Sequence, residues 1–233
     1  MSEKENYKVV KHNSLINAES KFPYTLNQAK LICHLISNIK PNEDDFETKA
    51  VSLRELGFVG ENSENYTYFK EEFLKLLEMP FQISGTKWWT NWFSSLSYDN
   101  GGIEYRFDPL LKPFLLNLKD NFSSYQLKNI LLLKSAYSIK IYELLNQYKV
   151  VGKRTMEIKD LRILLNLSRG YKNPNITNLL KEIQEELTIK TDLTFDFKPI
   201  KKSREFIAFE FDIKSNKKVR KLSLKNFKNI EST

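Results

Sequence analysis

Cysteine and histidine are scarce in this chain of 233 residues, and their scarcity excludes several kinds of site. Cys33 is the only cysteine, so neither an internal disulfide nor a multi-cysteine zinc site is possible. It falls within an apolar helical pattern, which predicts burial as its role. The two histidines, His12 and His34, lack the one-residue spacing of the pair that holds the metal in rolling-circle initiators. We therefore expect no metal site and no cofactor.

Long apolar runs and glycine-rich loops are also missing. No apolar run approaches the ~20 residues of a membrane span, so we expect no membrane segment. No phosphate loop of the nucleotide-hydrolase type is present. Acidic pairs such as Asp44-Asp45 and Glu71-Glu72 are typical of solvated surface rather than of acid-base machinery. The sequence thus predicts a protein that is not an enzyme, and because residues 1–10 lack the apolar core of a secretory signal we expect it in the cytoplasm.

The positive charge of the chain, +8 in total, is concentrated in its second half. Residues 1–120 hold 14 Lys and Arg against 17 Asp and Glu, whereas residues 121–233 hold 23 against 12. A half-chain this basic attracts polyanions by long-range steering and counterion release. Nucleic acid is therefore the predicted partner of the second half, with solubility alone as the alternative explanation of the charge.

Residues 1–120 have the order of elements of a winged helix. Thr25 is suited to cap a helix with an apolar stripe, and a short strand near Val51 follows it. Pro80 ends a longer helix that carries apolar residues on one face. The elements predicted after Val51 are a small helix at 53–56, the longer helix at 62–78, and strands at 81–84, 88–98 and 103–107.

Residues 121–214 repeat this order without a residue-by-residue repeat. Apolar residues recur at helical spacing over 125–148, which predicts one long scaffold helix that ends before Gly152. The fold class is therefore predicted as α+β, with two tandem winged-helix domains (a helix-turn-helix plus a β-hairpin wing in each) and a basic flexible tail at 215–233. The elements predicted after Gly152 are a strand at 155–158, helices at 159–166 and 173–187, and strands at 194–200 and 205–213.

The helix that begins at Asn173 carries the strongest candidate site. Asn173 is a suitable N-cap, and Pro174 suits the first helical position. Opposite its leucine-rich face lie polar side chains of the types that read a major groove: Asn pairs with adenine, Lys reaches guanine or phosphate, and Thr touches the thymine methyl. The acids of this helix come later, and recognition helices insert their amino-terminal residues. The predicted contact residues are Lys172, Asn173, Asn175, Thr177, Asn178 and Lys181.

Basic residues near this helix predict contacts with phosphates. The loop between the last two strands would form a wing over the backbone or minor groove, which contributes affinity rather than sequence information. For any single lysine a solvated surface position is an equally good interpretation, so the prediction rests on clustering. The residues are Lys198, Lys201, Lys202 and Arg204 in the wing, with Lys149, Lys153 and Arg154 as further candidates.

The corresponding helix of the first half presents acids outward, namely Glu64, Glu71 and Glu78, which a phosphate backbone would repel. We expect only an auxiliary DNA contact there, through Tyr66, Tyr68 and Lys70 near its amino-terminal end. The strand that follows holds more aromatic surface than one strand face buries. A larger core and a protein interface are both open explanations for Trp88, Trp89, Trp92 and Phe93.

Six segments of the chain, in order, resemble the plasmid initiator family called the Rep-3 superfamily, over about Val9 to Lys214. The order and spacing of these segments carry the resemblance, rather than any single string. The segments are "VVKHNSLINA", "FDPLLKPFLLNL", "YSIKIYELL", "TMEIKDLRILLNL", "TDLTFDF" and "KKSREFIAFEFDIK".

The resemblance implies two winged helices, of which the second reads iterons (repeated origin sites in double-stranded DNA) and the first contacts backbone and mediates dimerisation. It further implies that monomers start theta-type replication, that dimers repress the initiator's own promoter at an operator, and that the host replication initiator and replicative helicase are partners. The acidic outward face of the first half departs from that pattern. A winged-helix transcriptional repressor without origin function stays an alternative, as does an interaction adaptor with incidental charge.

Overall fold

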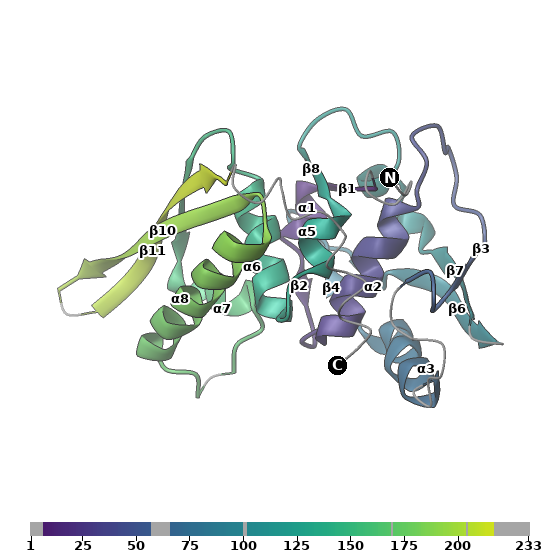
Figure 1. Cartoon of the computed structure of the whole chain (residues 1–233), viewed down its shortest axis with the longest axis horizontal. Coiled ribbons are helices and arrows are strands. Elements are labelled where there is room, and N and C mark those ends of the chain that lie inside the picture. Colours follow the sequence, from purple (N-terminus) through teal and green to yellow (C-terminus); the bar gives the residue numbers. More distant parts are fainter. Residues whose placement is uncertain (1–6, 57–65, 100–101, 169, 204, 217–233) are drawn as a thin grey trace. The chain divides into compact units, whose positions relative to one another are not determined.

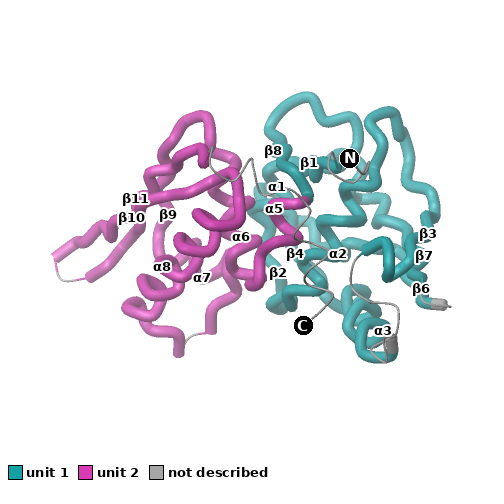
Figure 2. Tube along the Cα trace, viewed as in Figure 1, with its two compact units in different colours: residues 1–127 teal, residues 128–233 magenta. Residues whose placement is uncertain are grey.

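The computed structural model describes residues 7–56, 66–99, 102–168, 170–203 and 205–216. It divides into unit 1, residues 1–127, and unit 2, residues 128–233 (Figure 1, Figure 2). We expected the second domain to begin at residue 121. Strand β8 (Phe122–Gln126) instead pairs antiparallel with β1 (Lys8–His12) inside unit 1, so the boundary between the two units follows Leu127.

The scaffold helix of unit 1, α2 (Leu26–Ser37), begins where the sequence predicts. Thr25 Oγ1 accepts from the Gln28 N–H at 3.2 Å, and Gln28 Oε1 accepts from the Thr25 N–H at 3.0 Å, which makes a capping box. Cys33 is buried on this helix, as predicted. Ahead of it lie β1, α1 (Asn13–Ile16) and β2 (Glu19–Ser20).

The wing sheet of unit 1 has the antiparallel order β3-β7-β6, formed by β3 (Lys49–Ser52), β6 (Phe93–Asp99) and β7 (Gly102–Phe107). Helix α3 (Tyr66–Leu74) and the 3-10 helix η2 (Lys75–Glu78) lie between β3 and β6 in the sequence, and the predicted helix residues 62–65 fall outside the described part. The small helix expected at 53–56 is a turn closed by a hydrogen bond from the Leu56 N–H to the Ser52 carbonyl at 3.2 Å.

A second small sheet in unit 1 corrects the single strand predicted over 88–98. It has the order β2-β4-β5, with β4 (Phe81–Gln82) and β5 (Trp89–Thr90). The chain leaves this sheet after β5 and enters the wing sheet at β6. The residues predicted as one strand therefore belong to two different sheets. Unit 1 closes with the 3-10 helix η3 (Pro109–Leu111), α4 (Lys112–Leu115) and β8.

The single helix predicted over 125–148 is wrong. Residues 122–126 form β8, and the rest is divided into α5 (Leu127–Leu131) and α6 (Ala136–Asn146). The break is set locally, because Ser135 lies in an extended conformation and its side chain caps α6 by accepting from the Tyr137 N–H. Apolar residues on both sides of the break, among them Ile130 in α5 and Ile141 in α6, are fully buried, which is why helical spacing continues through it.

The remainder of unit 2 is a winged helix around an aromatic and aliphatic core. After α6 come β9 (Lys153–Glu157), α7 (Ile158–Leu164), α8 (Asn173–Lys190), β10 (Leu193–Lys202) and β11 (Glu205–Ser215). The sheet is antiparallel with order β10-β11-β9. Phe195, Phe209 and Phe211 are buried, as is one face of α8. Most of the tail predicted at 215–233 lies outside the described residues.

Candidate nucleic-acid interface

Helices α7 and α8 of unit 2 form a helix-turn-helix whose turn has a defined start. Asn166 adopts a left-handed conformation (φ 51°) just after α7. The Leu167 N–H donates to the Arg162 carbonyl at 2.9 Å, and the Asn166 N–H donates to the Ile163 carbonyl at 3.0 Å. These two bonds are those of a Schellman motif, which satisfies carbonyls at the end of α7. The direction in which the chain leaves α7 is thereby fixed.

The start of α8 differs from the prediction that Asn173 is its N-cap. Lys172 occupies the cap position, and its side chain makes no capping hydrogen bond; Asn173 is the first helical residue. Asn173 Oδ1 accepts instead from Arg162 Nη2 at 2.9 Å. The amide is engaged by the neighbouring helix and so does not cap its own. Pro174 lies in the first turn, where its missing N–H leaves no helical hydrogen bond unmade.

Helix α8 has one buried and one exposed face, as the sequence predicts. Ile176, Leu180, Ile183 and Leu187 are buried. On the other side Asn175, Asn178 and Lys181 are exposed, together with Lys172, while Thr177 is half-buried. The predicted polar face is therefore not covered by the described part of the protein. Side-chain groups of the kind that read base edges are thus exposed at Asn175, Asn178 and Lys181.

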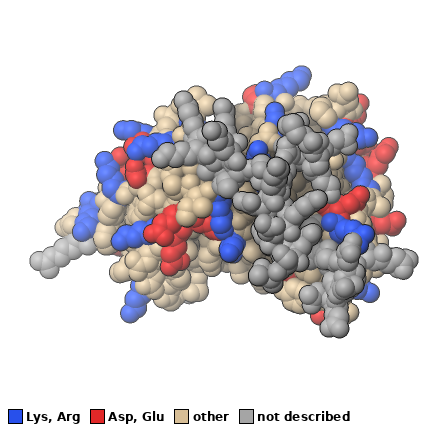
Figure 3. All heavy atoms as spheres, in the orientation of Figure 1, with Lys and Arg blue, Asp and Glu red and all other residues tan. Residues whose placement is uncertain are grey.

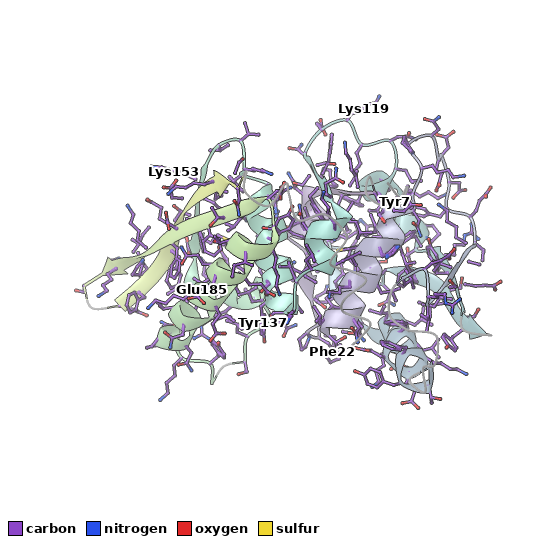
Figure 4. All side chains as sticks on the ribbon, viewed as in Figure 1. Tyr7, Phe22, Lys119, Tyr137, Lys153 and Glu185 are labelled. Carbon is purple, nitrogen blue, oxygen red and sulfur yellow. The ribbon has the colours of Figure 1, made fainter. Side chains whose placement is uncertain are left out.

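The acids of α8 divide into exposed and structural ones. Glu182 and Glu185 are exposed in the carboxyl-terminal half, and Figure 3 shows acidic side chains gathered over this part of unit 2; Glu185 is labelled in Figure 4. Glu186 binds the Ser138 hydroxyl at 2.6 Å, the Lys134 N–H at 2.8 Å and Lys190 Nζ at 2.6 Å. Burial alone would raise the pKa of Glu186, but these hydrogen bonds outweigh it and the pKa is lowered.

The wing of unit 2 presents basic side chains with different degrees of freedom. Lys202 is exposed, whereas Lys201 lies over the Phe206 ring, with Nζ 4.7 Å from its centroid. Lys198 Nζ pairs with Glu210 at 2.8 Å, and the hydrogen bond to Glu210 raises the pKa of the lysine. Arg204 is outside the described residues. To bind a phosphate, Lys198 would have to break its ion pair with Glu210, whereas Lys202 has no such ion pair among the described residues.

Two of the three further basic candidates have structural partners. Lys149 Nζ lies 2.6 Å from Asp192 Oδ2, and Asp192 Oδ1 also accepts from the buried Tyr142 hydroxyl at 2.9 Å. Arg154 stacks on Tyr148, 4.6 Å from the ring centroid, and donates to the Leu144 carbonyl; burial lowers the pKa of its guanidinium. Lys153, at the start of β9, is exposed (Figure 4). The structure thus gives Lys149 and Arg154 a role inside unit 2.

In unit 1 the candidate contact residues on α3 lie close to an exposed acid. Tyr68, Lys70 and Glu71 are all exposed, and the side chain of Tyr66 is outside the described part. Glu72, which we expected on the solvated surface with Glu71, is instead buried. Its Oε1 accepts from the Thr25 hydroxyl and its Oε2 from Asn27 Nδ2 at 3.1 Å. The sequence marks Thr25 as a helix cap but does not indicate which acid would contact it.

The tryptophan-rich segment of unit 1 is divided between the core and the surface. Trp92 and Phe93 are buried, and Trp92 Nε1 donates to the Tyr24 hydroxyl at 3.0 Å. Trp88 and Trp89 are about half exposed, at 53% and 52%. A larger core therefore accounts for two of the four aromatics. A protein interface stays a prediction for the other two.

Among the described residues, no group of three or more His, Cys, Asp and Glu side chains is placed to hold a metal ion. No helix in the described ranges has both the length and the apolar character needed to cross a membrane.

Two family models match this chain. The family model described as Initiator Replication protein, WH1, matches residues 8–146, and that described as Initiator Rep protein, WH2, matches residues 157–213. Curated protein sequences give no match.

Two solved structures give measures of structural similarity. The chain resembles the Pi initiator protein, solved in complex with iteron DNA, at 17% identity and a TM-score of 0.70, over 91% of this chain and 99% of that one. Domains 2 and 3 of RctB match at 9% identity over 86% of this chain and 81% of that one, with a TM-score of 0.44. At 17% identity the Pi structure shows the shared fold, and the two family models match most of the sequence. The chain belongs to the family of initiator replication proteins, with a WH1 winged helix followed by a WH2 winged helix.

Proposed function

We propose that this chain starts plasmid replication by binding iterons in double-stranded DNA, with α8 of unit 2 in the major groove. Its family membership supports the initiator role. The Pi structure, which has the same fold, holds iteron DNA. The observation that carries the proposal is the exposed polar face formed by Asn175, Asn178 and Lys181 on a helix whose other face is buried.

The reading residues and the phosphate contacts have different tasks. Asn175 and Asn178 would pair with adenine edges, while Lys181 would reach guanine or phosphate; a good bidentate contact discriminates by roughly 1–3 kcal/mol. Lys202 and Lys201 in the wing would neutralise phosphates without reading sequence. The exposed acids Glu182 and Glu185 come later along α8, and winged-helix readers of this kind insert the amino-terminal part of the helix. Only the first turns of α8 need to approach the bases.

Unit 1 would have an auxiliary role in this scheme. Tyr68 and Lys70 would touch the duplex backbone, and the exposed Trp88 and Trp89 are available for the dimerisation that we propose for this unit. As a dimer the protein would bind its own operator and repress its promoter; as a monomer it would load the replicative helicase together with the host initiator. We propose that it acts in the bacterial cytoplasm by binding alone, without an enzymatic step.

Origin dependence tests this function. A plasmid that carries the gene and the repeated sites beside it should replicate in a host that lacks any other initiator for it. In mobility shifts, a duplex of these repeats should bind more tightly than a shuffled duplex at the same salt concentration. Regulation of the promoter with an inactive origin would instead favour the repressor without origin function. Equal binding of both duplexes would exclude sequence-specific reading.

A further inference from the structure

Arg162 of α7 holds both ends of the turn that leads into α8. At the start of the turn its backbone carbonyl accepts from the Leu167 N–H at 2.9 Å. At the far end its guanidinium donates to the Tyr171 carbonyl and, at 2.9 Å, to Asn173 Oδ1. A longer contact of 3.4 Å joins it to the Ser168 carbonyl between them. One residue therefore connects the last turn of α7 to the first residue of α8.

The chemistry of the contact explains why an arginine stands at this position. The guanidinium offers several N–H donors in a rigid planar fork. Its acceptors here are the carbonyls of Ser168 and Tyr171 in the turn and the side-chain amide oxygen of Asn173, the first residue of α8. A lysine would supply a point charge without the fork, and a glutamine would reach fewer acceptors.

We propose that Arg162 is a positioning residue that sets where the amino-terminal turn of α8 lies, and through it the sequence specificity of the protein. This inference rests on the proposed function of α8. Asn175 and Asn178 lie within two turns of the segment that Arg162 holds. Base-edge hydrogen bonds form only within a few tenths of an ångström of their preferred length, so a small displacement of this turn removes them. Phosphate contacts tolerate the same displacement, because ionic attraction varies slowly with distance.

A loss of sequence discrimination would therefore distinguish the loss of positioning by Arg162 from the simple loss of one positive charge. The matched control is Lys159→Gln, since Lys159 is also on α7, is exposed and pairs only with Glu157 at 2.9 Å among the contacts described. For the test, the full chain first selects its preferred duplex from a randomised library. Dissociation constants are then measured on the selected duplex and on a shuffled one for the wild type, Arg162→Gln, Arg162→Lys and Lys159→Gln.

The discrimination ratio is the dissociation constant on the shuffled duplex divided by that on the selected duplex. Arg162→Gln should lower this ratio by roughly tenfold, within the range for the loss of one good base contact. Its affinity for the shuffled duplex should match that of Lys159→Gln, and Arg162→Lys should recover only part of the ratio. In the protein without DNA, hydrogen exchange should quicken at the Leu167, Tyr171 and Asn175 amides and stay unchanged at Ile183 and Leu187. This exchange pattern distinguishes a local release of the turn from unfolding of unit 2.

Two results would overturn the inference. If Arg162→Gln weakens both duplexes equally, Arg162 contacts phosphate or supports the fold in general. If Arg162→Gln binds both duplexes as tightly as the wild type does, the turn does not govern reading. A wild-type protein that selects no duplex from the library would instead overturn the proposed function of α8, and the inference about specificity would fall with it.

Discussion

Helices α3 of unit 1 and α8 of unit 2 secure their scaffold helices by the same means. On α3, Glu72 accepts from the Thr25 hydroxyl at the cap of α2 and from Asn27 in its first turn. On α8, Glu186 accepts from the Lys134 N–H and the Ser138 hydroxyl around the start of α6. In each unit a carboxylate thus meets the positive end of a helix dipole. Acids on these two helices are partly structural, so a count of acids does not measure repulsion from DNA.

The outward faces of the same two helices differ. The first turns of α8 present Asn175, Asn178 and Lys181, and its exposed acids come after them. In α3 the exposed Glu71 lies one turn after Tyr68 and directly after Lys70, whereas in α8 the exposed Asn175 and Asn178 lie one to two turns ahead of the first exposed acid, Glu182. The two units thus share an internal design and differ in their outward residues. Under the proposed function, sequence reading belongs to α8.

The largest expected effect concerns the anchor of α3. Glu72→Ala leaves the Thr25 hydroxyl and the Asn27 amide without their carboxylate, and should lower the unfolding free energy of unit 1 by about 3 kcal/mol. Urea unfolding followed by tryptophan fluorescence reports on unit 1 alone, because all three tryptophans lie in it. The exposed neighbour supplies the control: Glu71→Ala should change stability by less than about 0.5 kcal/mol. Similar losses for both variants would contradict the buried anchor.

The second prediction compares the outward faces on DNA. Asn178→Ala and Lys181→Ala in α8 should each weaken binding to the preferred duplex by roughly 1–3 kcal/mol and shuffled duplex much less. Tyr68→Ala and Lys70→Ala in α3 should weaken both duplexes alike, by a smaller amount. Mobility shifts at one salt concentration measure all four. A loss of discrimination in the α3 variants would assign sequence reading to both units.

The sequence predicts those features that repeat along one element. The buried and exposed faces of α8, the strands β10 and β11 and the capping of α2 by Thr25 follow from periodicity and local chemistry, and the structure confirms them. Features that depend on a distant partner could not be predicted. Glu72 contacts residues 44 to 47 positions away, and the strand pairing that sets the unit boundary joins β1 to β8.

Within the candidate site the same limit applies to individual charges. Lys149 and Arg154 belong to a basic cluster in the sequence, but Asp192 and Tyr148 engage them in the fold. Asn173 has the residue type of an N-cap, yet Arg162 binds its side chain. Residue type and spacing thus find the surface that faces outward. They do not tell which polar groups on it are already bound.

The third prediction tests the anchor of α8 by pH. The pKa of Glu186 is lower in the folded protein than in the unfolded chain, so the unfolded chain binds more protons between these two pKa values. The stabilising contribution of Glu186 is fully present above its unfolded pKa of about 4.3. It is lost as the pH falls through the folded pKa. The stability difference between the wild type and Glu186→Gln, about 1 kcal/mol at pH 7, should therefore shrink as the pH is lowered below the unfolded pKa of glutamate, about 4.3. Hydrogen exchange of the α6 and α8 amides measures it, and a difference that grows on acidification would contradict the sign.

The smallest expected effect separates two lysines of the same wing. Lys202 is exposed, and its removal should reduce the slope of log affinity against log salt by about one. Lys198 is already paired with Glu210, so Lys198→Ala should change the slope less than Lys202→Ala does. In Glu210→Ala, Lys198 loses its partner and becomes free to contact a phosphate. The double variant Lys198→Ala with Glu210→Ala should therefore have a salt slope smaller than that of Glu210→Ala by about one phosphate contact. Salt titrations on shuffled duplex measure each slope. Equal slopes for Lys198→Ala and Lys202→Ala would show that the ion pair opens on DNA, and that the wing acts through its total charge rather than through its unpaired side chains.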